Sequence, residues 1–93
     1  MIRSIKGKLI RHVLAGKHGK GFPTGLFDTT VRKIAQLEAA AAPDDLRIPS
    51  DNRLEALRND RAGQYSIRIN DQWRVCFRWG VSGPEDVEIV DYH

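Results

Sequence analysis

The sequence has little of what several large classes of protein require. Its 93 residues contain one cysteine, Cys76, so no disulfide can form within the chain, which is typical of proteins from a reducing compartment. No apolar run approaches the roughly 20 residues that a membrane-spanning helix needs. The apolar run that follows the basic first residues is interrupted by Arg11 and His12. We therefore expect a cytoplasmic protein with no secretory signal and no membrane partner.

The sequence also lacks the common motifs of metal and nucleotide chemistry. Its three histidines contain no pair at helical i, i+4 spacing, and the lone cysteine cannot supply a CxxC pair. The four glycines between residues 16 and 25 do not have the spacing of a Walker A loop, and no GxSxG nucleophile elbow is present. We therefore expect neither a metal nor a cofactor.

Acidic side chains are absent from residues 1–27. This segment carries six cations, Arg3, Lys6, Lys8, Arg11, Lys17 and Lys20, so the formal net charge of +3 hides an uneven distribution. A one-sided positive surface suits a polyanion such as RNA, and it equally suits an acidic protein partner. A solvated basic surface without any partner is the alternative, and the charge pattern is compatible with all three.

Hydrophobic periodicity predicts two helices in the first half of the chain. Residues 8–15 carry an apolar stripe at helical spacing, and Gly16 follows as a stop. Residues 16–25 are rich in glycine and lysine, which predicts a loop of low order. A longer helix follows and ends before Pro43. Its candidate first residues or caps are Thr24, Asp28 and Thr29.

The second half changes to the period-two pattern of β-strands. Apolar and polar residues alternate over residues 65–69 and 73–79, with turn residues between them. Two helices followed by antiparallel strands form an α+β layout, in which we expect the helices to cover the apolar sheet face of a single domain, residues 1–93. The other expected strands are a short opening one over residues 2–5, one over residues 53–58, and a last one over residues 87–91.

Three arginines occupy polar positions of the two central predicted strands. Arg68, Arg74 and Arg78 should therefore share the sheet face that points away from the helices. Three like charges on one face repel one another unless something anionic lies among them, which suggests a phosphate-binding surface, with solvated arginines as the alternative. Trp73 and Trp79 fall on the apolar face and are expected in the core, and we expect Cys76 to be a buried structural thiol.

The remaining polar residues suit cleavage of RNA without a metal. The 2′-hydroxyl of RNA can attack the adjacent phosphate, so an enzyme needs only to align the attack, move protons and stabilise charge. The guanidinium fork matches phosphate oxygens, and an imidazole exchanges protons near neutral pH. The candidates for proton transfer are His93, Tyr92, Asp91 and Glu55, and those for phosphate binding are Arg58, Arg68, Arg74 and Arg78. The alternatives are a frayed terminus, a rim aromatic ring and ordinary surface charges.

Several segments, in order along the chain, resemble the HigB family of plasmid-maintenance killer proteins in the RelE/ParE toxin superfamily. They are NRLEAL at residues 52–57, DRAGQYSIRINDQWRVCF at residues 60–77 and VEIVDYH at residues 87–93. The opening residues MIRS are similar as well. The resemblance covers nearly the whole chain and is weakest over the glycine-lysine loop. Linked motifs in the right order make it specific, which the terminal Asp-Tyr-His alone would not.

The resemblance implies a RelE-like fold, with two N-terminal helices packed on a mainly antiparallel sheet of four to five strands. It implies the toxin of a type II toxin–antitoxin system, an endoribonuclease that cleaves mRNA on the ribosome. The implied partner is a HigA-like antitoxin whose helix-turn-helix domain binds operator DNA, so that the toxin reaches DNA only indirectly. The family's functional positions that match here are Arg58, Arg74, Asp91, Tyr92 and His93.

One position departs from the family pattern. Some relatives have a histidine where this chain has Glu55, and a carboxylate is a weaker base than imidazole unless its pKa is raised. The resemblance therefore leaves the general base open, and His93 is the other candidate.

Two other functions remain open at this stage. The chain could be a non-catalytic toxin of the same fold that inhibits a gyrase-like target, or a plain RNA-binding module. A toxin of the gyrase type is not expected to need a terminal imidazole, so deletion of His93 distinguishes it from a nuclease. A structural subunit with no nucleic-acid role fits the basic half of the chain poorly.

Overall fold

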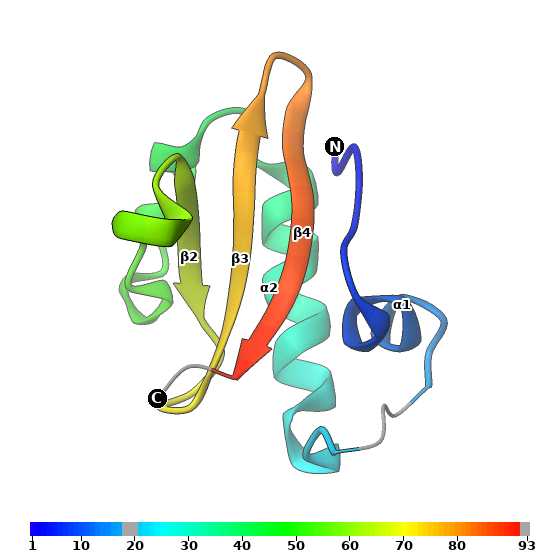
Figure 1. Cartoon of the computed structure of the whole chain (residues 1–93). Coiled ribbons are helices and arrows are strands. Elements are labelled where there is room, and N and C mark those ends of the chain that lie inside the picture. Colours follow the sequence, from blue (N-terminus) through cyan, green and yellow to red (C-terminus); the bar gives the residue numbers. More distant parts are fainter. Residues whose placement is uncertain (18–20, 92–93) are drawn as a thin grey trace.

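Two helices lie against one face of a four-stranded antiparallel sheet (Figure 1). The computed structural model describes residues 1–17 and 21–91. Its helices are α1 (Lys8–Leu14) and α2 (Phe27–Ala39), and its strands are β1 (Glu55–Ala56), β2 (Gln64–Arg68), β3 (Trp73–Gly80) and β4 (Gly83–Asp91), which lie in the order β1-β2-β3-β4. The predicted α+β class is therefore confirmed. Only the short α1 is N-terminal, because α2 lies nearer the middle of the chain.

The helices begin and end close to where the sequence predicts. The first helix ends at Leu14, and Gly16 follows with a φ of 76°. A 3-10 turn over Thr24–Leu26 runs directly into α2, so Thr24 does begin the helical segment. Asp28 and Thr29 are wrong as N-caps, since both lie inside the first turn of α2. The loop prediction over residues 16–25 includes residues 18–20, which lie outside the described part.

The strands differ from the prediction at three places. Residues 2–5 do not form a strand, because Ile5 makes a single parallel bridge to Val87 before the chain turns away at Gly7, whose φ is 89°. The strand expected over residues 53–58 shrinks to Glu55–Ala56, since left-handed residues stand on both sides of it, Arg53 with a φ of 45° and Asn59 with a φ of 56°. The last strand is longer than expected and begins at Gly83.

The hairpin turn predicted between β2 and β3 is present, and a side chain closes it. The Asn70 Oδ1 atom accepts hydrogen bonds from the backbone N–H groups of Gln72 and Trp73, at 2.9 and 2.7 Å. An Asn side chain that bonds the backbone two residues on is a common device for tightening a turn. The turn fixes the register of the two central strands and hence which side chains share a face.

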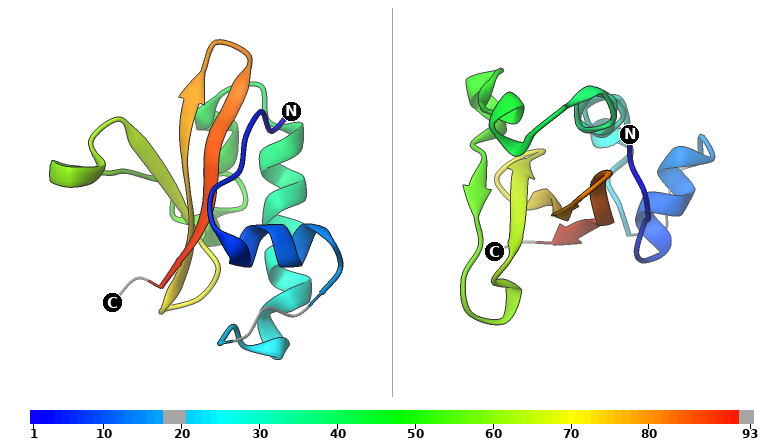
Figure 2. Two further views of the ribbon diagram at one scale, coloured as in Figure 1. Left: turned by 45° about the vertical axis from the view of Figure 1, so that its right-hand side comes forward. Right: turned by 90° about the horizontal axis from the view of Figure 1, so that it is seen from above.

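The core lies between the helices and the sheet (Figure 2). Phe77 on β3 is fully buried, with the Tyr65 ring stacked at 5.9 Å and the Trp79 ring edge-on at 6.2 Å. Trp73 is a core residue as predicted and meets Phe22 edge-on at 5.0 Å, whereas Trp79 is half-buried and packs against the core. In the described part of the chain, no helix is long and apolar enough to cross a membrane.

Candidate functional site

The sheet face that points away from the helices, here called the outer face, carries the three predicted arginines. The register of β2 and β3 places Arg68 opposite Arg74, and Gln64 opposite Arg78. These positions alternate with core residues of the same strands, so the arginines share one face, as the period-two pattern predicts. Figure 2 shows both helices on the other side of the sheet.

Carboxylates of the chain itself accompany two of these arginines. The Arg68 Nη2 atom lies 2.5 Å from the Asp71 Oδ1 atom, and the Arg78 Nε atom lies 3.7 Å from the Asp86 Oδ2 atom. The hydrogen bond and the charge of Arg68 hold the pKa of Asp71 below its ordinary value. The repulsion expected among the arginines is therefore relieved in part within the protein, and an external anion is not needed for the face to form.

Arg74 is held by hydrogen bonds from two directions. Its Nε atom donates to the Ser66 Oγ atom at 2.7 Å, and its Nη2 atom donates to the backbone carbonyl oxygen of Arg53, also at 2.7 Å. Ser66 is fully buried, so this acceptor cannot swing into solvent. Two bonds to fixed acceptors define the plane of the guanidinium group. A cation whose plane is set in advance loses little freedom when it binds a phosphate.

Cys76 lies at the centre of the outer face and is completely buried. Register places it opposite Ser66 on one side and Glu88 on the other. Across the same strands, the Arg61 Nη1 atom bonds the Glu88 Oε1 atom at 3.2 Å and the Gln64 Oε1 atom at 3.0 Å. Burial raises the pKa of the Cys76 thiol, against the smaller opposing effect of the Arg61 charge. The predicted burial of this thiol is confirmed.

The burial of Cys76 gives a direct test of how tightly this face is packed. We expect iodoacetamide at neutral pH to label the thiol at least about 100-fold more slowly in the native protein than in denaturant, because only an exposed thiolate is a good nucleophile. Mass spectrometry along a time course measures both rates. Labelling of the native protein at the denatured rate would contradict the packing described above.

Glu55 and Arg58 lie beside the outer face at its open edge. Glu55 on β1 pairs with Ser66, which places it in the same cross-strand row as Cys76 and Glu88. Both residues are exposed and line a surface hollow of about 380 Å³ along β1. Within residues 1–17 and 21–91, the Glu55 and Arg58 side chains have no hydrogen-bond or ion-pair partner. Both are therefore accessible to a ligand that lies across the sheet.

The terminal candidates are placed only in part. Asp91 ends β4 opposite Trp73, and its Oδ1 atom accepts a hydrogen bond from the Gln72 Nε2 atom at 3.1 Å. The residue of β4 that faces Arg74 in register is Val90. Asp91 thus lies at the end of the sheet, one position along β4 from the residue paired with Arg74. Tyr92 and His93 lie outside the described residues.

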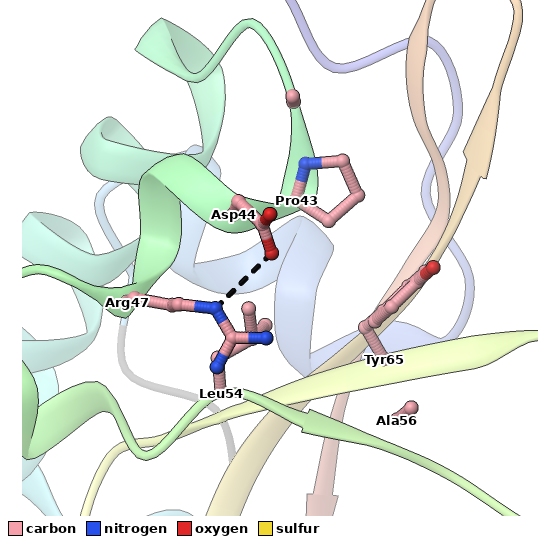
Figure 3. A pocket seen from close by; sticks show the side chains of 7 residues that line it. Pro43, Asp44, Arg47, Leu54, Ala56 and Tyr65 are labelled. Atoms are coloured by element: carbon pink, nitrogen blue, oxygen red, sulfur yellow. Dashed lines mark hydrogen bonds and ion pairs between the residues drawn. The ribbon is translucent and has the colours of Figure 1, made fainter.

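A second hollow lies on the helix side of the sheet and is separate from these arginines (Figure 3). It has a volume of about 260 Å³ between the 3-10 helix η2 (Pro43–Arg47) and strands β1 and β2, with Leu54 and Tyr65 in its wall. The one arginine there, Arg47, is paired with Asp44 at 3.1 Å. This hollow therefore offers no cluster of cations and is not part of the candidate site.

Three groups near Arg74 and Cys76 were not predicted from the sequence. Glu88 alternates with core residues of β4, so its position on the outer face could have been deduced from the period-two pattern. Arg61 lies in a 3-10 turn, and its bond to Glu88 joins residues 27 positions apart, for which the sequence offers no signal. The position of the Arg53 carbonyl depends on a left-handed backbone conformation, which an arginine in the sequence gives no reason to expect. No group of three or more metal-ligating side chains occurs among the described residues.

Comparison with known proteins decides the family. A model of the RelE-like toxin of the type II toxin–antitoxin system HigB matches residues 5–93. The chain belongs to the HigB-like toxin family. It is 41% identical over 63 residues to Toxin HigB-1 of Vibrio cholerae, an alignment that spans 68% of this chain and 66% of the Vibrio protein. The resemblance seen in the sequence motifs is therefore confirmed.

Two further matches to this HigB-like chain are weaker. An uncharacterized protein of Haemophilus influenzae is 36% identical over 62 residues, which span 67% of this chain and 60% of that protein. These alignments thus cover less than two thirds of the length of either bacterial relative. The RelBE2 toxin–antitoxin complex of Mycobacterium tuberculosis contains a chain with a TM-score of 0.48 and 19% identity, with 100% of this chain and 96% of that chain covered.

Proposed function

We propose that this HigB-like toxin is a metal-independent endoribonuclease that cleaves mRNA on the ribosome in the cytoplasm. The observation that carries the proposal is Arg74, whose guanidinium plane is set by two hydrogen bonds on a sheet face that also holds Arg68 and Arg78. Membership of the toxin family supports it. The preorganised arginine is suited to charge that builds up on a phosphate as RNA is cleaved.

The proposed reaction uses the ribose of the substrate as the nucleophile. The 2′-oxygen attacks the adjacent phosphorus and gives its proton to a base of the protein. The bond from phosphorus to the 5′-oxygen breaks, and a protein acid donates a proton to that oxygen. The products are a 2′,3′-cyclic phosphate and a 5′-hydroxyl. Arg74, Arg68 and Arg78 bind phosphate oxygens, and Arg58 holds the strand at the edge of the sheet.

Proton transfer is assigned to Glu55 and to the terminal residues. Glu55 pairs with Ser66 across β1 and β2, and its side chain has no partner in the described part of the chain. Its carboxylate can therefore accept the 2′-proton. When Glu55 is the base, a protonated His93 donates the proton to the leaving 5′-oxygen; when neutral His93 is the base instead, it passes the proton it has taken up to that oxygen. Tyr92 stacks on a nucleobase or assists proton transfer, and Asp91 orients its neighbours.

The two candidate bases should differ in importance. We expect Glu55→Ala to reduce the rate of cleavage about tenfold and His93→Ala to reduce it about 100-fold or more, because general acid–base groups contribute about 10²- to 10⁴-fold and a carboxylate is by its chemistry a weaker base than an imidazole. Single-turnover cleavage of mRNA on purified ribosomes measures both. Equal losses from the two variants would refute this order.

The partner is proposed to be a HigA-like antitoxin with a helix-turn-helix domain, through which the pair binds operator DNA. The acid-free segment of residues 1–27 suits an acidic surface of that partner as well as ribosomal RNA. The antitoxin can silence the toxin either by covering the outer face or by making the complex too large for the ribosome.

The test of the proposal is induction in bacteria, with the wild type beside a His93 deletion. Primer extension should map new mRNA 5′ ends within translated codons for the wild type alone, and these ends should vanish when translation is blocked. Cleavage that continues without translation would remove the ribosome from the proposal. Growth arrest with no new ends would favour a non-catalytic toxin that acts by binding, with DNA topology as the next measurement.

A further inference from the structure

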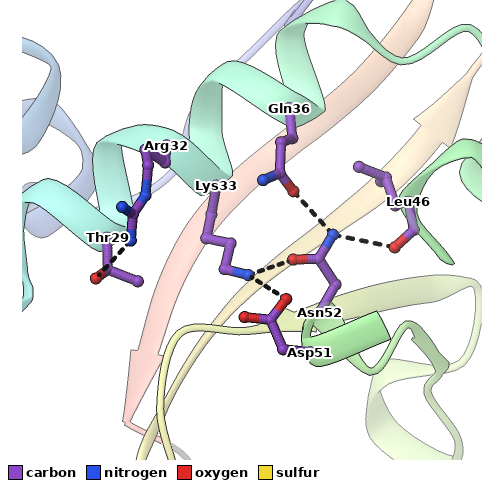
Figure 4. Close-up of polar contacts among 7 residues, drawn as sticks. All are labelled: Thr29, Arg32, Lys33, Gln36, Leu46, Asp51 and Asn52. Carbon is purple, nitrogen blue, oxygen red and sulfur yellow. Dashed lines mark hydrogen bonds and ion pairs between the residues drawn. The ribbon is translucent and has the colours of Figure 1, made fainter. Parts of the chain in front are cut away.

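A buried lysine ties α2 to the short 3-10 helix η3 (Ser50–Asn52) (Figure 4). The Lys33 side chain is almost fully buried, and its Nζ atom donates to the Asn52 Oδ1 atom at 2.5 Å and to the Asp51 Oδ1 atom at 3.3 Å. A buried ammonium group is costly unless it is paired and hydrogen-bonded. Both contacts go to neighbouring residues of one short segment, so Lys33 fixes the position of η3 on α2.

Asn52 is the centre of this cluster. It is fully buried, and its Nδ2 atom donates to the Gln36 Oε1 atom at 2.9 Å and to the Leu46 carbonyl oxygen at 3.1 Å. With Lys33 on its Oδ1 atom, both ends of the amide group are bonded. The partners come from α2 and from η2, so two separate parts of the chain hold Asn52 in one orientation.

The next residue, Arg53, connects this cluster to the outer face. Its backbone is left-handed, with φ 45° and ψ 56°, and its N–H donates to the Ser50 carbonyl oxygen at 3.2 Å. This conformation is unfavourable for an L-residue other than glycine, so the surroundings must hold it. The carbonyl oxygen of the same residue accepts the 2.7 Å hydrogen bond from the Arg74 Nη2 atom. The acceptor that orients Arg74 therefore belongs to the residue directly after Asn52.

We propose that Lys33 is a positioning residue for Arg74, acting through the Asn52 amide and the Arg53 carbonyl. Lys33 lies in the helical layer, on the other side of the sheet from the outer face, and does not itself touch RNA. Its amine holds Asn52, Asn52 holds the left-handed turn at Arg53, and the turn presents its carbonyl to Arg74. The catalytic meaning of this link rests on the proposed function, whereas the link itself is a property of the folded toxin.

The first test observes Arg74 directly and needs no activity. In Lys33→Met, we expect the Arg74 Nη2–H group, the donor to the Arg53 carbonyl, to exchange with water about three- to tenfold faster than in the wild type, the change for losing roughly one hydrogen bond of ordinary strength. Nitrogen-15 NMR of the arginine side chains measures this rate. Arg32→Met is the matched control, because Arg32 lies on the same helix, is exposed and bonds Thr29 at 3.3 Å. It should leave the rate unchanged.

A second variant keeps the test decisive if Lys33→Met does not fold. Gln36→Met removes one acceptor of Asn52 while leaving the buried amine paired, and it should accelerate the same exchange in the same direction. An unchanged exchange rate of the Arg74 Nη2–H group in either folded variant would overturn the proposal, whatever happens to the melting temperature.

The activity test is a double-mutant cycle. We expect Lys33→Met to lower kcat for mRNA cleavage on ribosomes with KM unchanged, and to cause no further loss when Arg74 is already alanine, because residues that act through one group are not additive. Independent, additive losses would show that Lys33 only stabilises the fold. If the wild type itself cleaves nothing, the proposed function fails while the NMR result still decides the link between Lys33 and Arg74.

Discussion

Replacing Arg74 with alanine should reduce mRNA cleavage about 100- to 1,000-fold, as the loss of one preorganised donor to a developing charge does in other enzymes. Arg74 is the arginine of the outer face whose orientation is fixed by both a buried hydroxyl and a backbone carbonyl. Its removal should therefore lower kcat more than it raises KM. Arg74→Lys keeps the charge and loses the planar fork, so we expect an intermediate loss.

Single-turnover cleavage on programmed ribosomes measures this effect, with thermal unfolding to show that each variant is folded. Arg47→Ala is the matched control, because that exposed arginine is paired with Asp44 on the helix side of the sheet and should leave the rate within about twofold. A folded Arg74→Ala variant that cleaves at the wild-type rate would remove Arg74, and the outer face with it, from the mechanism.

Replacing Phe77 with alanine should lower the free energy of unfolding by about 3–5 kcal/mol. The ring is completely buried, contacts the rings of Tyr65 and Trp79, and lies at the centre of the sheet on β3. The free energy of unfolding of a domain is about 5–15 kcal/mol, so the cavity left by this substitution would remove much of the stability.

Urea denaturation followed by tryptophan fluorescence measures the loss. Val81→Ala is the matched control, since Val81 is fully exposed in the turn between β3 and β4 and should change the free energy by less than about 0.5 kcal/mol. A loss below about 1.5 kcal/mol for Phe77→Ala would mean that the core around β3 is looser than its burial indicates.

The outer face could be predicted because a strand has only two sides. Once residues 65–69 and 73–79 are recognised as strands joined by a tight turn, alternation alone places Arg68, Arg74 and Arg78 together. The same argument correctly assigned Trp73 to the core. Local rules were sufficient here because each conclusion depends on neighbours within a few positions of the chain.

What could not be predicted depends on contacts between distant residues. The bonds of Lys33 to Asn52 and of Arg61 to Glu88 join parts of the chain 19 and 27 positions apart. The strand at residues 53–58 was predicted too long because its limits are set by left-handed residues, Arg53 and Asn59, whose types favour no such conformation strongly. Periodicity also missed the 3-10 helices, since their few residues carry no repeating pattern.

The meeting of residues 3–6 with β4 has a consequence for the order of events during synthesis. The Ser4 hydroxyl oxygen accepts from the Asp86 N–H, and the Ser4 carbonyl from the Val87 N–H, across a separation of more than 80 positions. Contacts of such range form late, because the whole intervening loop must close first. While the chain is being translated, its first residues have no sheet edge to bind until β4 has left the exit tunnel. A toxin proposed to act on ribosomes thus cannot pack residues 3–6 in place until the ribosome that makes it has already translated β4.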